Sequence, residues 1–515
     1  MSLDPFALPE TLNLAEFFLH AQARQHPTRP ALYCGDDTVT YGALAEQVNR
    51  TAGLLRTLGL ESEQRVLLAM PDTPEFAYAW FAAVQVGGVV SAINPDTKAE
   101  ELEYFLNYTR ARVLFADGIT LPALAQVRAR CPHLKRVLVS RGAHGGDLDF
   151  AAERARTPPD PAIAATHRDD TAVWLYTSGS TGFPKAAVHK QHDFVFNALT
   201  YALPVAGYRA SDKCLSVPRL AFGYALGTNL LFPLLAGGSA VLFPEKPTPD
   251  VLFAHLKKHR PTFLTLVPTS LNQMLGHPQL ESVDFSSVRV ALSAGEALPP
   301  ELYLRWKERT KVEVLDGIGS AEMFHIFISN HEGDVVPGSL GKVVKGYEAK
   351  VCDDDGAEVP RGEVGTLWIR GDSMALEYWQ QHEKSKQTFR GDWCVSADKF
   401  RQDENGYFWF CGRGDELLKV GGKWLAPIEV ENALLQHPAV KEAAVVGFKD
   451  QDGLEKPKAF VALNAGHAAG SALEKALQEH VRAKLAPFKA PRQVVFVDAL
   501  PRSDRGKVLK GQLRG

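Results

Sequence analysis

The chain has 515 residues, more than one hydrophobic core usually organises, so we expect several domains with a cleft between them. An apolar fraction of 45% and a charged fraction of 23% are ordinary for globular proteins and exclude disorder, collagen and coiled coil. The formal net charge of −3 offers no electrostatic footprint for nucleic acid or an anionic bilayer, so we expect a small molecule as the partner.

The N-terminal half begins with signals that argue against export. Asp4 and Pro5 stand where a signal peptide needs basic residues followed by an apolar run. The most apolar stretch, residues 76–93, follows a good helix start at 72–74 and is broken at 87–88. It predicts a buried helix, a turn and a strand, not a membrane span.

The cysteines also argue against export, because their spacing fits a reducing compartment. All six lie far apart and none forms a C-x-x-C pair, which disfavours structural zinc and a disulfide framework. We therefore expect a cytoplasmic protein.

Short β-rich runs then alternate with helical patterns through the first four hundred residues, which predicts α/β layers with mainly parallel sheets. The runs that we expect as strands are 112–115, 137–139, 173–176, 240–243, 263–267 and 288–292. Apolar stripes predict helices over 249–259 and 299–309.

Past about residue 340 the pattern changes to shorter strands separated by turns. Residues 349–352 and 365–369 predict strands of a small β-rich subdomain. From residue 415 a compact pattern follows, with strands at 443–448, 459–463 and 494–497 and a helix over about 471–484. We predict an N-terminal domain over 1–414, including a β-rich subdomain over about 337–414, and a small α+β domain over 415–515.

The first motif that indicates chemistry runs from Tyr176 to Lys185. It follows a predicted strand, places hydroxyls between glycines and ends in a lysine, so backbone N–H groups and hydroxyls can bind phosphate oxygens. It is not a Walker loop, because Pro184 precedes the lysine. The alternative is a flexible Gly/Ser turn, which the residue order and the lysine disfavour.

A pair of histidines follows this loop. His189 and His192 have the spacing of a metal pair, but without further ligands the spacing favours the start of a surface helix.

Three further segments complete the pattern. Residues 316–323 follow a β-rich run and place Glu322 among small residues, where a carboxylate beside bound phosphates can hold Mg²⁺, although a lone glutamate is often only solvated. Residues 412–431 and 500–510 are ordinary when each is taken alone.

In this order, the four segments resemble the acyl-adenylate-forming superfamily of acyl-CoA ligases, luciferases and nonribosomal adenylation domains. The resemblance covers nearly the whole chain. It implies a large N-terminal domain, a small mobile C-terminal lid, and two half-reactions separated by a rotation of that lid. It also implies ATP, Mg²⁺ and coenzyme A as the molecules that the protein binds.

The resemblance implies a role for each matching residue. Lys507 would bridge the substrate carboxylate and the α-phosphate, Glu322 would coordinate Mg²⁺, and Lys185 would close the phosphate loop. Asp398 would hold the ribose, with Arg413 as its basic partner. The implied nucleotide-binding residues are Thr177, Ser178, Gly179, Ser180, Thr181, Gly182, Ala294, Gly295, Glu296, Asp316, Gly317, Ile318, Ser320, Ala321, Asp398 and Arg413.

The C-terminal segments supply the remaining implied roles. Asp415 would be the hinge, and Gly421 and Gly422 would line the pantetheine tunnel. Two departures stand out: Ala321 occupies a position where the family usually has threonine, and residues 396–398 read Ser-Ala-Asp instead of Thr-Gly-Asp. Neither departure removes a charged group.

The segments 219–227 and 319–326 resemble those of benzoate-type CoA ligases, which implies an aromatic carboxylic acid such as benzoate or 2-aminobenzoate. Gly223 stands where these ligases usually have alanine. The missing methyl group indicates either room for a substituent on the ring or a glycine that only serves a turn. His325 is a polar pocket wall or a structural histidine. The implied pocket residues are Phe222, Gly223, Tyr224, Ala294, Gly319, His325 and Ile326.

Alternatives to an aryl-CoA ligase remain. Neither Ala221 nor Phe222 is acidic, which disfavours an α-amino acid because its buried ammonium would be unpaired. An aryl-acid adenylating enzyme that loads a carrier protein stays open, and luciferase-like oxygenation is the weaker reading. A nucleotide-binding module without catalysis is disfavoured by the retained charged residues. We expect no nucleic-acid or membrane partner, and the oligomeric state is open, with a homodimer as one alternative.

Overall fold

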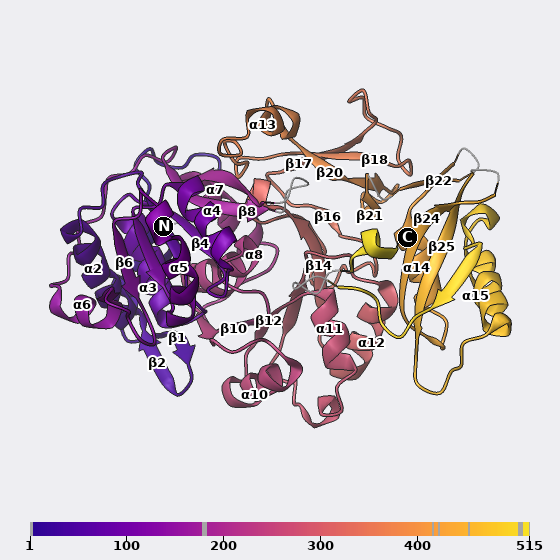
Figure 1. Ribbon diagram of the computed structural model, residues 1–515, viewed down its shortest axis with the longest axis horizontal. Coiled ribbons are helices and arrows are strands. Elements are labelled where there is room, and N and C mark those ends of the chain that lie inside the picture. Colours follow the sequence, from indigo (N-terminus) through magenta and orange to yellow (C-terminus); the bar gives the residue numbers. More distant parts are fainter. Residues whose placement is uncertain are drawn as a thin grey trace.

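The structure is a computed structural model that describes residues 4–177, 183–414, 417–420, 423–451, 454–502 and 508–513, with the backbone alone at 413, 419, 423 and 424. Figure 1 shows its elements in sequence colours, from the indigo N-terminal part to the yellow C-terminal part. The predicted ends of the two domains meet at residues 414 and 415. Since residue 415 lies outside the described residues, that boundary stays a prediction.

The first large sheet has seven strands in the order β7-β6-β5-β3-β4-β8-β9. Neighbouring strands are parallel except for the last pair, β8 and β9. The strands are β3 (Arg65–Ala69), β4 (Val89–Ile93), β5 (Val113–Ala116), β6 (Arg136–Val139), β7 (Leu148–Asp149), β8 (Thr171–Thr177) and β9 (Lys185–Lys190).

The second large sheet has nine strands in the order β16-β15-β14-β13-β12-β10-β11-β1-β2. Its central strands are parallel and buried throughout, which explains their continuous apolar runs, and its edges are antiparallel. The strands are β1 (Pro30–Cys34), β2 (Asp37–Thr40), β10 (Lys213–Ser216), β11 (Ser239–Leu242), β12 (Phe263–Leu266), β13 (Val290–Ser293), β14 (Val314–Gly319), β15 (Ile326–Ser329) and β16 (Lys342–Val343).

Helices pack around these sheets as the apolar stripes predict. The predicted buried helix, turn and strand are α3 and β4, with Pro74 in the first turn of α3. No helix of the described residues is long and apolar enough to cross a membrane. The helices are α1 (Ala21–Gln25), α2 (Tyr41–Thr57), α3 (Pro74–Gln85), α4 (Ala99–Thr109), α5 (Leu121–Val127), α6 (Phe150–Arg156), α7 (Gln191–Asn197), α8 (Gly223–Leu226), α9 (Phe232–Ala236), α10 (Pro249–His259), α11 (Pro268–Leu275), α12 (Pro300–Thr310), α13 (His382–Thr388), α14 (Pro427–Leu435) and α15 (Ser471–Lys484).

Single turns of other helix types connect several of these elements. The π-helical turns are η1 (Glu16–His20), η4 (Ala198–Ala202) and η5 (Gly227–Leu231). The 3-10 turns are η2 (Gly118–Thr120), η3 (Arg128–Arg130), η6 (Leu280–Ser282), η7 (Ala321–Met323), η8 (Pro487–Lys489) and η9 (Lys510–Leu513).

Two smaller units follow. A β-rich sheet, orange in Figure 1, contains β17 (Glu348–Cys352), β18 (Gly365–Arg370), β19 (Phe389–Arg390), β20 (Trp393–Gln402) and β21 (Phe408–Arg413). The C-terminal part contains the hairpin of β22 (Leu418–Val420) and β23 (Lys423–Leu425) and a sheet of β24 (Val440–Lys449), β25 (Glu455–Leu463) and β26 (Gln493–Phe496). The predicted α/β class, with layered sheets, a β-rich unit and a small C-terminal unit of strands and helices, is confirmed.

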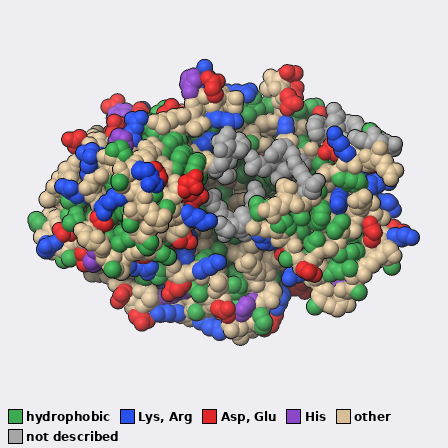
Figure 2. Space-filling model, in the orientation of Figure 1, with side chains coloured by type: hydrophobic (Ala, Val, Ile, Leu, Met, Phe, Trp, Pro, Cys, Tyr) green, Lys and Arg blue, Asp and Glu red, His purple; other side chains and the backbone are tan. Residues whose placement is uncertain are grey.

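The visible surface agrees with the near-neutral charge. Figure 2 shows basic and acidic side chains interspersed on this face, which is hollowed near its centre between the N-terminal and C-terminal parts. A face with both signs interspersed offers no broad patch of a single charge.

A buried carboxylate links the two large sheets. Asp72 follows β3 of the first sheet, and its carboxylate oxygens lie 3.1 and 3.3 Å from the backbone nitrogen of Leu220, which follows β10 of the second sheet. Arg219 Nη1 lies 3.9 Å from Asp72 Oδ2. Burial raises the pKa of Asp72 to about 6, because the charged form is poorly solvated there.

This raised pKa predicts a pH-dependent stability. The folded protein binds a proton at Asp72 more tightly than the unfolded chain, so the stabilising contribution grows as the pH falls from 8 to 5 and is lost as the pH rises through 6. Relative to Asp72→Asn, the wild-type free energy of unfolding should increase by about 1–2 kcal/mol over that fall. Denaturant unfolding at several pH values measures it. The exposed Asp37→Asn is the control, and a constant difference between wild type and Asp72→Asn would contradict the assignment.

Candidate active site

The two ends of the predicted phosphate loop lie opposite one another. Thr177 ends β8 and pairs with Lys185 at the start of β9, whereas Ser178, Gly179, Ser180, Thr181 and Gly182 lie outside the described residues. The segment that enters β9 is anchored by α4: Phe183 stacks on Tyr104 with ring centroids 4.4 Å apart, and the Tyr104 hydroxyl donates to the Pro184 carbonyl at 2.8 Å. This anchoring fixes where Lys185 begins.

Lys185 and Glu322 meet at one aromatic ring. The Tyr378 hydroxyl donates to Glu322 Oε1 at 2.5 Å, and Lys185 Nζ lies 3.9 Å from the centroid of the same ring. The segment around Tyr378 is held against β9, because Trp379 N donates to the Ala186 carbonyl at 3.0 Å. The phosphate-loop lysine and the predicted metal-binding glutamate, far apart in sequence, are therefore brought together.

Several of the predicted nucleotide-binding residues, which the resemblance implies as a wall for the adenine, lie at the carboxyl ends of two parallel strands. Ser293 in β13 pairs with Asp316 in β14, which places Ala294 and Gly317 next to each other at the same edge. Gly295 has a φ of +86°, in the left-handed region that favours glycine. Glu296 accepts a hydrogen bond from the Thr269 hydroxyl at 2.9 Å.

Asp316 is a neutral acid in this wall. Burial raises the pKa of its carboxyl group to about 8, so the group is protonated at neutral pH. A protonated carboxyl both donates and accepts hydrogen bonds, which suits a neutral base more than a phosphate.

A strained turn follows the wall. Ser320 precedes the 3-10 turn η7, which holds Ala321 and the half-buried Glu322. Phe324 then has a φ of +65° and a ψ of −58°, and His325 N donates to the Met323 carbonyl at 2.8 Å, which is a γ-turn. A side chain at Gly319 would place its Cβ 2.5 Å from the His325 carbonyl oxygen, so only glycine fits beside this turn.

An aromatic cluster surrounds His325, one of the predicted pocket residues. The His325 ring lies 5.4 Å from Tyr224, 4.8 Å from Phe232 and 5.5 Å from Tyr201, measured between centroids. Burial lowers the pKa of His325 to about 3, so the ring is uncharged at neutral pH. Nε2 donates to the Tyr224 carbonyl at 3.0 Å, and Nδ1 has no hydrogen-bond partner in the described part of the chain.

Three other predicted pocket residues lie beside this cluster. Phe222 precedes α8, which begins at Gly223, and Ile326 begins β15 next to His325. A Cβ at Gly223 would lie 3.0 Å from Leu175 Cδ1 and 3.1 Å from the Phe324 carbonyl oxygen. Protein atoms already fill the space that a methyl group would take, so the structure favours the alternative reading, in which Gly223 serves the local backbone.

The remaining predicted residues are only partly described. Asp398 in β20 pairs with Arg413 in β21 across two antiparallel strands, as expected of a ribose-binding acid and its basic partner. The Arg413 side chain, Asp415, Gly421, Gly422 and Lys507 lie outside the described residues.

Tyr378 was not among the predicted site residues, and the prediction for His189 was wrong. The predicted surface helix start is instead the buried end of β9: His189 is 0% exposed, and the helix α7 begins only at Gln191. The apolar run Ala186–Val188 was a signal for a buried strand at this point. Nothing around Tyr378 in the sequence indicates its contact with Glu322.

The donor set fits a magnesium ion better than a transition metal. Among the described residues, no group of three or more His, Cys, Asp or Glu side chains is placed to hold a metal ion. A single half-buried carboxylate, Glu322, suits Mg²⁺, which prefers oxygen ligands and shares them with phosphates and water.

Comparison with known proteins identifies the family. The family model described as AMP-binding enzyme matches residues 19–379, and that of the AMP-binding enzyme C-terminal domain matches 429–507. A benzoate–CoA ligase of Thauera aromatica is 42% identical, over 98% of this chain and 96% of its own.

Solved structures have the same fold along the whole chain. The anthranilate CoA ligase AuaEII in complex with anthranoyl-AMP has a TM-score of 0.94 at 37% identity, covering 99% of this chain and 98% of its own. A benzoate CoA ligase from Burkholderia xenovorans has a TM-score of 0.89 at 39% identity, covering 98% of this chain and 100% of its own. The chain therefore belongs to the AMP-binding enzyme family, and the resemblance to acyl-adenylate-forming enzymes is confirmed.

Proposed function

We propose that the chain is an ATP-dependent, AMP-forming aryl-CoA ligase, an acid–thiol ligase that converts an aromatic carboxylic acid into its CoA thioester. The observation that carries the proposal is the meeting of Lys185 and Glu322 at Tyr378, beside the adenine wall formed by β13 and β14. The names of the relatives, benzoate–CoA ligase and anthranilate CoA ligase, support an aryl acid as the substrate.

The first half-reaction makes the acid a better acyl donor. A carboxylate oxygen attacks the α-phosphorus of ATP, the bond from that phosphorus to the bridging oxygen breaks, and pyrophosphate leaves. The barrier is mainly repulsion between negative oxygens, so Lys185 and Lys507 act by neutralising charge and by holding the reacting groups in line. Because the substrate carboxylate is itself the nucleophile and pyrophosphate is the leaving group, no nucleophilic side chain is needed.

Magnesium is the ion that we assign to Glu322. It would be held by the Glu322 carboxylate together with phosphate oxygens, and it would supply neutralisation of their charge. Tyr378 orients the carboxylate by donating to Oε1, which leaves the other carboxylate oxygen for the ion. The nucleotide base lies against Ala294, Gly295, Asp316, Gly317 and Ile318, and Asp398 with Arg413 holds the ribose.

The second half-reaction transfers the acyl group to sulfur. The CoA thiol attacks the acyl carbon, the bond from that carbon to the AMP oxygen breaks, AMP leaves, and the thiol proton passes to solvent. The face of the C-terminal part that carries Lys507 must move away for this attack. We therefore assign residues 415–515 as a lid that rotates about Asp415 and then presents Gly421 and Gly422 to the pantetheine arm.

The pocket favours a neutral ring. An aromatic wall around an uncharged His325 suits a benzoate, and the described rings of this wall, those of Tyr224 and Phe232, carry no negative charge that would pair with an ammonium group. His325 Nδ1 is a buried acceptor without a partner among the described residues, and an ortho amino group would supply the missing N–H. We therefore propose 2-aminobenzoate as an accepted substrate beside benzoate, and the cytoplasm, where ATP and CoA are available, as the location.

The choice of acid is the first test. AMP release with ATP, Mg²⁺ and CoA should be supported by benzoate and 2-aminobenzoate and not by octanoate or acetate, with the thioester identified by its mass. 2-Methylbenzoate is the steric control: if the amino N–H binds His325, kcat/KM should be about tenfold lower for the methyl compound. Pyrophosphate exchange without any effect of CoA would indicate a carrier protein as acceptor, and turnover of aliphatic acids alone would contradict the pocket.

The role of Tyr378 is the second test. Tyr378→Phe removes the hydrogen bond to Glu322 and keeps the ring over Lys185. A hydrogen bond to a charged group contributes about 1.5 kcal/mol or more, so adenylation measured by pyrophosphate exchange should slow about tenfold. Thioester formation from supplied aryl-AMP should stay within about twofold of wild type, and an equal loss in both assays would contradict the assignment.

The role of Lys507 separates the two half-reactions. Lys507→Ala should slow adenylation by about a hundredfold or more, because a charge that stabilises the transition state is lost. Transfer of the acyl group from supplied aryl-AMP to CoA should survive. Comparable losses in both steps would rule out a lid that uses one face for adenylation and another for thioester formation.

A further inference from the structure

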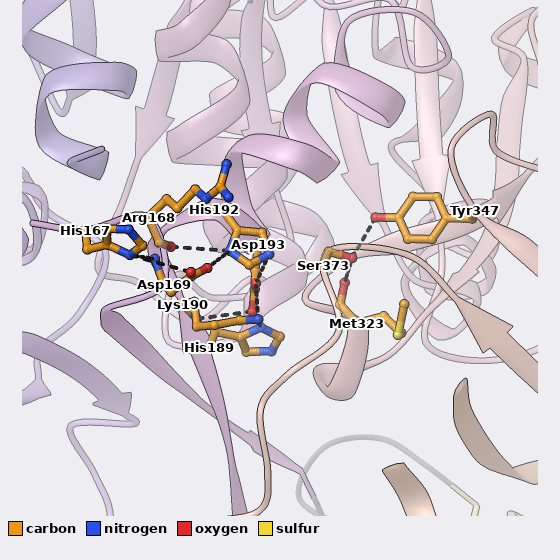
Figure 3. Close-up of polar contacts among 10 residues, drawn as sticks. All are labelled: His167, Arg168, Asp169, His189, Lys190, His192, Asp193, Met323, Tyr347 and Ser373. Carbon is orange, nitrogen blue, oxygen red and sulfur yellow. Dashed lines mark hydrogen bonds and ion pairs between the residues drawn. The ribbon is translucent and has the colours of Figure 1, made fainter. Parts of the chain in front are cut away.

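A buried histidine–aspartate pair holds the turn that carries Glu322. His189 at the end of β9 and Asp193 in the first turn of α7 are both 0% exposed, and Nδ1 of the histidine lies 2.8 Å from Asp193 Oδ2 (Figure 3). On the other side of the ring, Nε2 lies 2.7 Å from the carbonyl oxygen of Ala321, the residue before Glu322. The pair therefore connects the strand that follows the phosphate loop to the turn that holds Glu322.

The His189 ring donates to the turn. A backbone carbonyl can only accept, so Nε2 carries a hydrogen. On the other side of the ring, Asp193 Oδ2 also accepts the backbone N–H of Lys190 at 3.1 Å. The ring therefore bridges the Asp193 side chain and the backbone of the turn.

Two further basic side chains approach the other carboxylate oxygen of Asp193. His192 Nε2 lies 3.2 Å and Lys190 Nζ 3.9 Å from Asp193 Oδ1, and His192 Nδ1 lies 3.3 Å from Asp169 Oδ1.

Figure 3 shows this group on one side of the view and a second group, Ser373 between Tyr347 and Met323, on the other. Ser373 donates to the Met323 carbonyl at 2.8 Å, and its oxygen lies 2.7 Å from the Tyr347 hydroxyl.

These bonds fix the strained turn at successive residues. His189 holds the carbonyl of Ala321, the backbone N–H of Ala375 donates to the carbonyl of Glu322 at 2.8 Å, and Ser373 holds that of Met323. The next residue, Phe324, has a φ of +65°. A backbone in a sparsely populated conformation persists only where its surroundings over-determine it.

We propose that His189 and Asp193 are positioning residues for adenylation: through the Ala321 carbonyl they set the orientation of Glu322 toward the metal-bound nucleotide. The inference rests on the proposed function, because the role of Glu322 is part of it. Packing alone does not require two buried polar side chains here, since apolar side chains of similar volume often stabilise a core as well or better.

Two substitutions at one position separate the two bonds of the ring. The amide of His189→Gln reaches the place of Nε2 and keeps a donor for Ala321. The shorter His189→Asn reaches the place of Nδ1, keeps a donor for Asp193 and loses the bond to the turn. Both variants lose one buried hydrogen bond, so their folded stabilities should be similar, and only the Asn variant should disturb Glu322.

The first readout is the Mg²⁺ requirement of pyrophosphate exchange with benzoate, normalised to folded enzyme. Loss of a group that orients a metal ligand weakens metal binding by about ten- to a hundredfold, so the Asn variant should need about tenfold more Mg²⁺, and the Gln variant about the wild-type amount. The control is a substitution of another buried histidine, His20, whose Nε2 lies 2.8 Å from Gln85 Oε1. His20→Asn should not change the Mg²⁺ requirement. Asp193→Asn, which keeps the side-chain shape, should raise the requirement by a smaller factor and serves if the histidine variants do not fold.

The second readout needs no substrate. Hydrogen–deuterium exchange of a peptide covering 318–330 should be faster in His189→Asn and unchanged in His189→Gln. Equal behaviour of the two variants in both readouts, or effects that only follow thermal stability and appear in His20→Asn, would overturn the inference. If wild type shows no exchange with any aryl acid, the proposed function fails, while the hydrogen-exchange comparison still decides whether the pair holds the turn.

Discussion

The hydrogen bond between Tyr378 and Glu322 is the contact on which the site depends. Its two residues come from different parts of the chain, and the segment of Tyr378 also pairs with β9, which begins at Lys185. A lysine at the start of a strand of the first large sheet and a carboxylate that follows a strand of the second are thereby fixed against one tyrosine ring. Neither sheet alone can present both charges, so the packing of the two sheets is a condition for the chemistry.

Burial decides which groups of the site carry charge. Asp316 and His325 are enclosed, and burial makes both neutral near pH 7, by raising the pKa of the acid to about 8 and lowering that of the histidine to about 3. Glu322 and Lys185 are only half-buried. The neutral groups lie where a base and an aromatic ring are proposed to bind, and the half-buried charged groups lie where phosphates are proposed to bind.

The local part of the structure could be predicted from the sequence, and the long-range part could not. The apolar stripe over 249–259 and the pattern over 471–484 coincide with α10 and α15, because helix starts and periodicity are local signals. The Tyr378 bond spans 56 positions and the His189 bond to Ala321 spans 132, and no local pattern encodes either. Reading His189 and His192 as one local motif hid that they lie in different elements and environments. At Gly223, a missing methyl group suggested space, but packing by Leu175 and Phe324 decides whether space exists, and that needs coordinates.

A separate core makes the proposed rotation of the C-terminal part physically reasonable. Its buried apolar cluster is drawn entirely from residues 418–494, including Val430, Leu434, Val461 and Leu477, so those contacts persist while the unit moves as a body. The chain on either side of the residues 503–507 is also attached to this unit: Arg502 pairs with Glu442 at 2.9 Å, and Lys510 pairs with Glu431 at 2.8 Å. In the sequence, Lys507 lies between these two attachments. The rotation that brings a tunnel to the acyl carbon would then also withdraw the charge used in the first step, so one motion would serve both half-reactions.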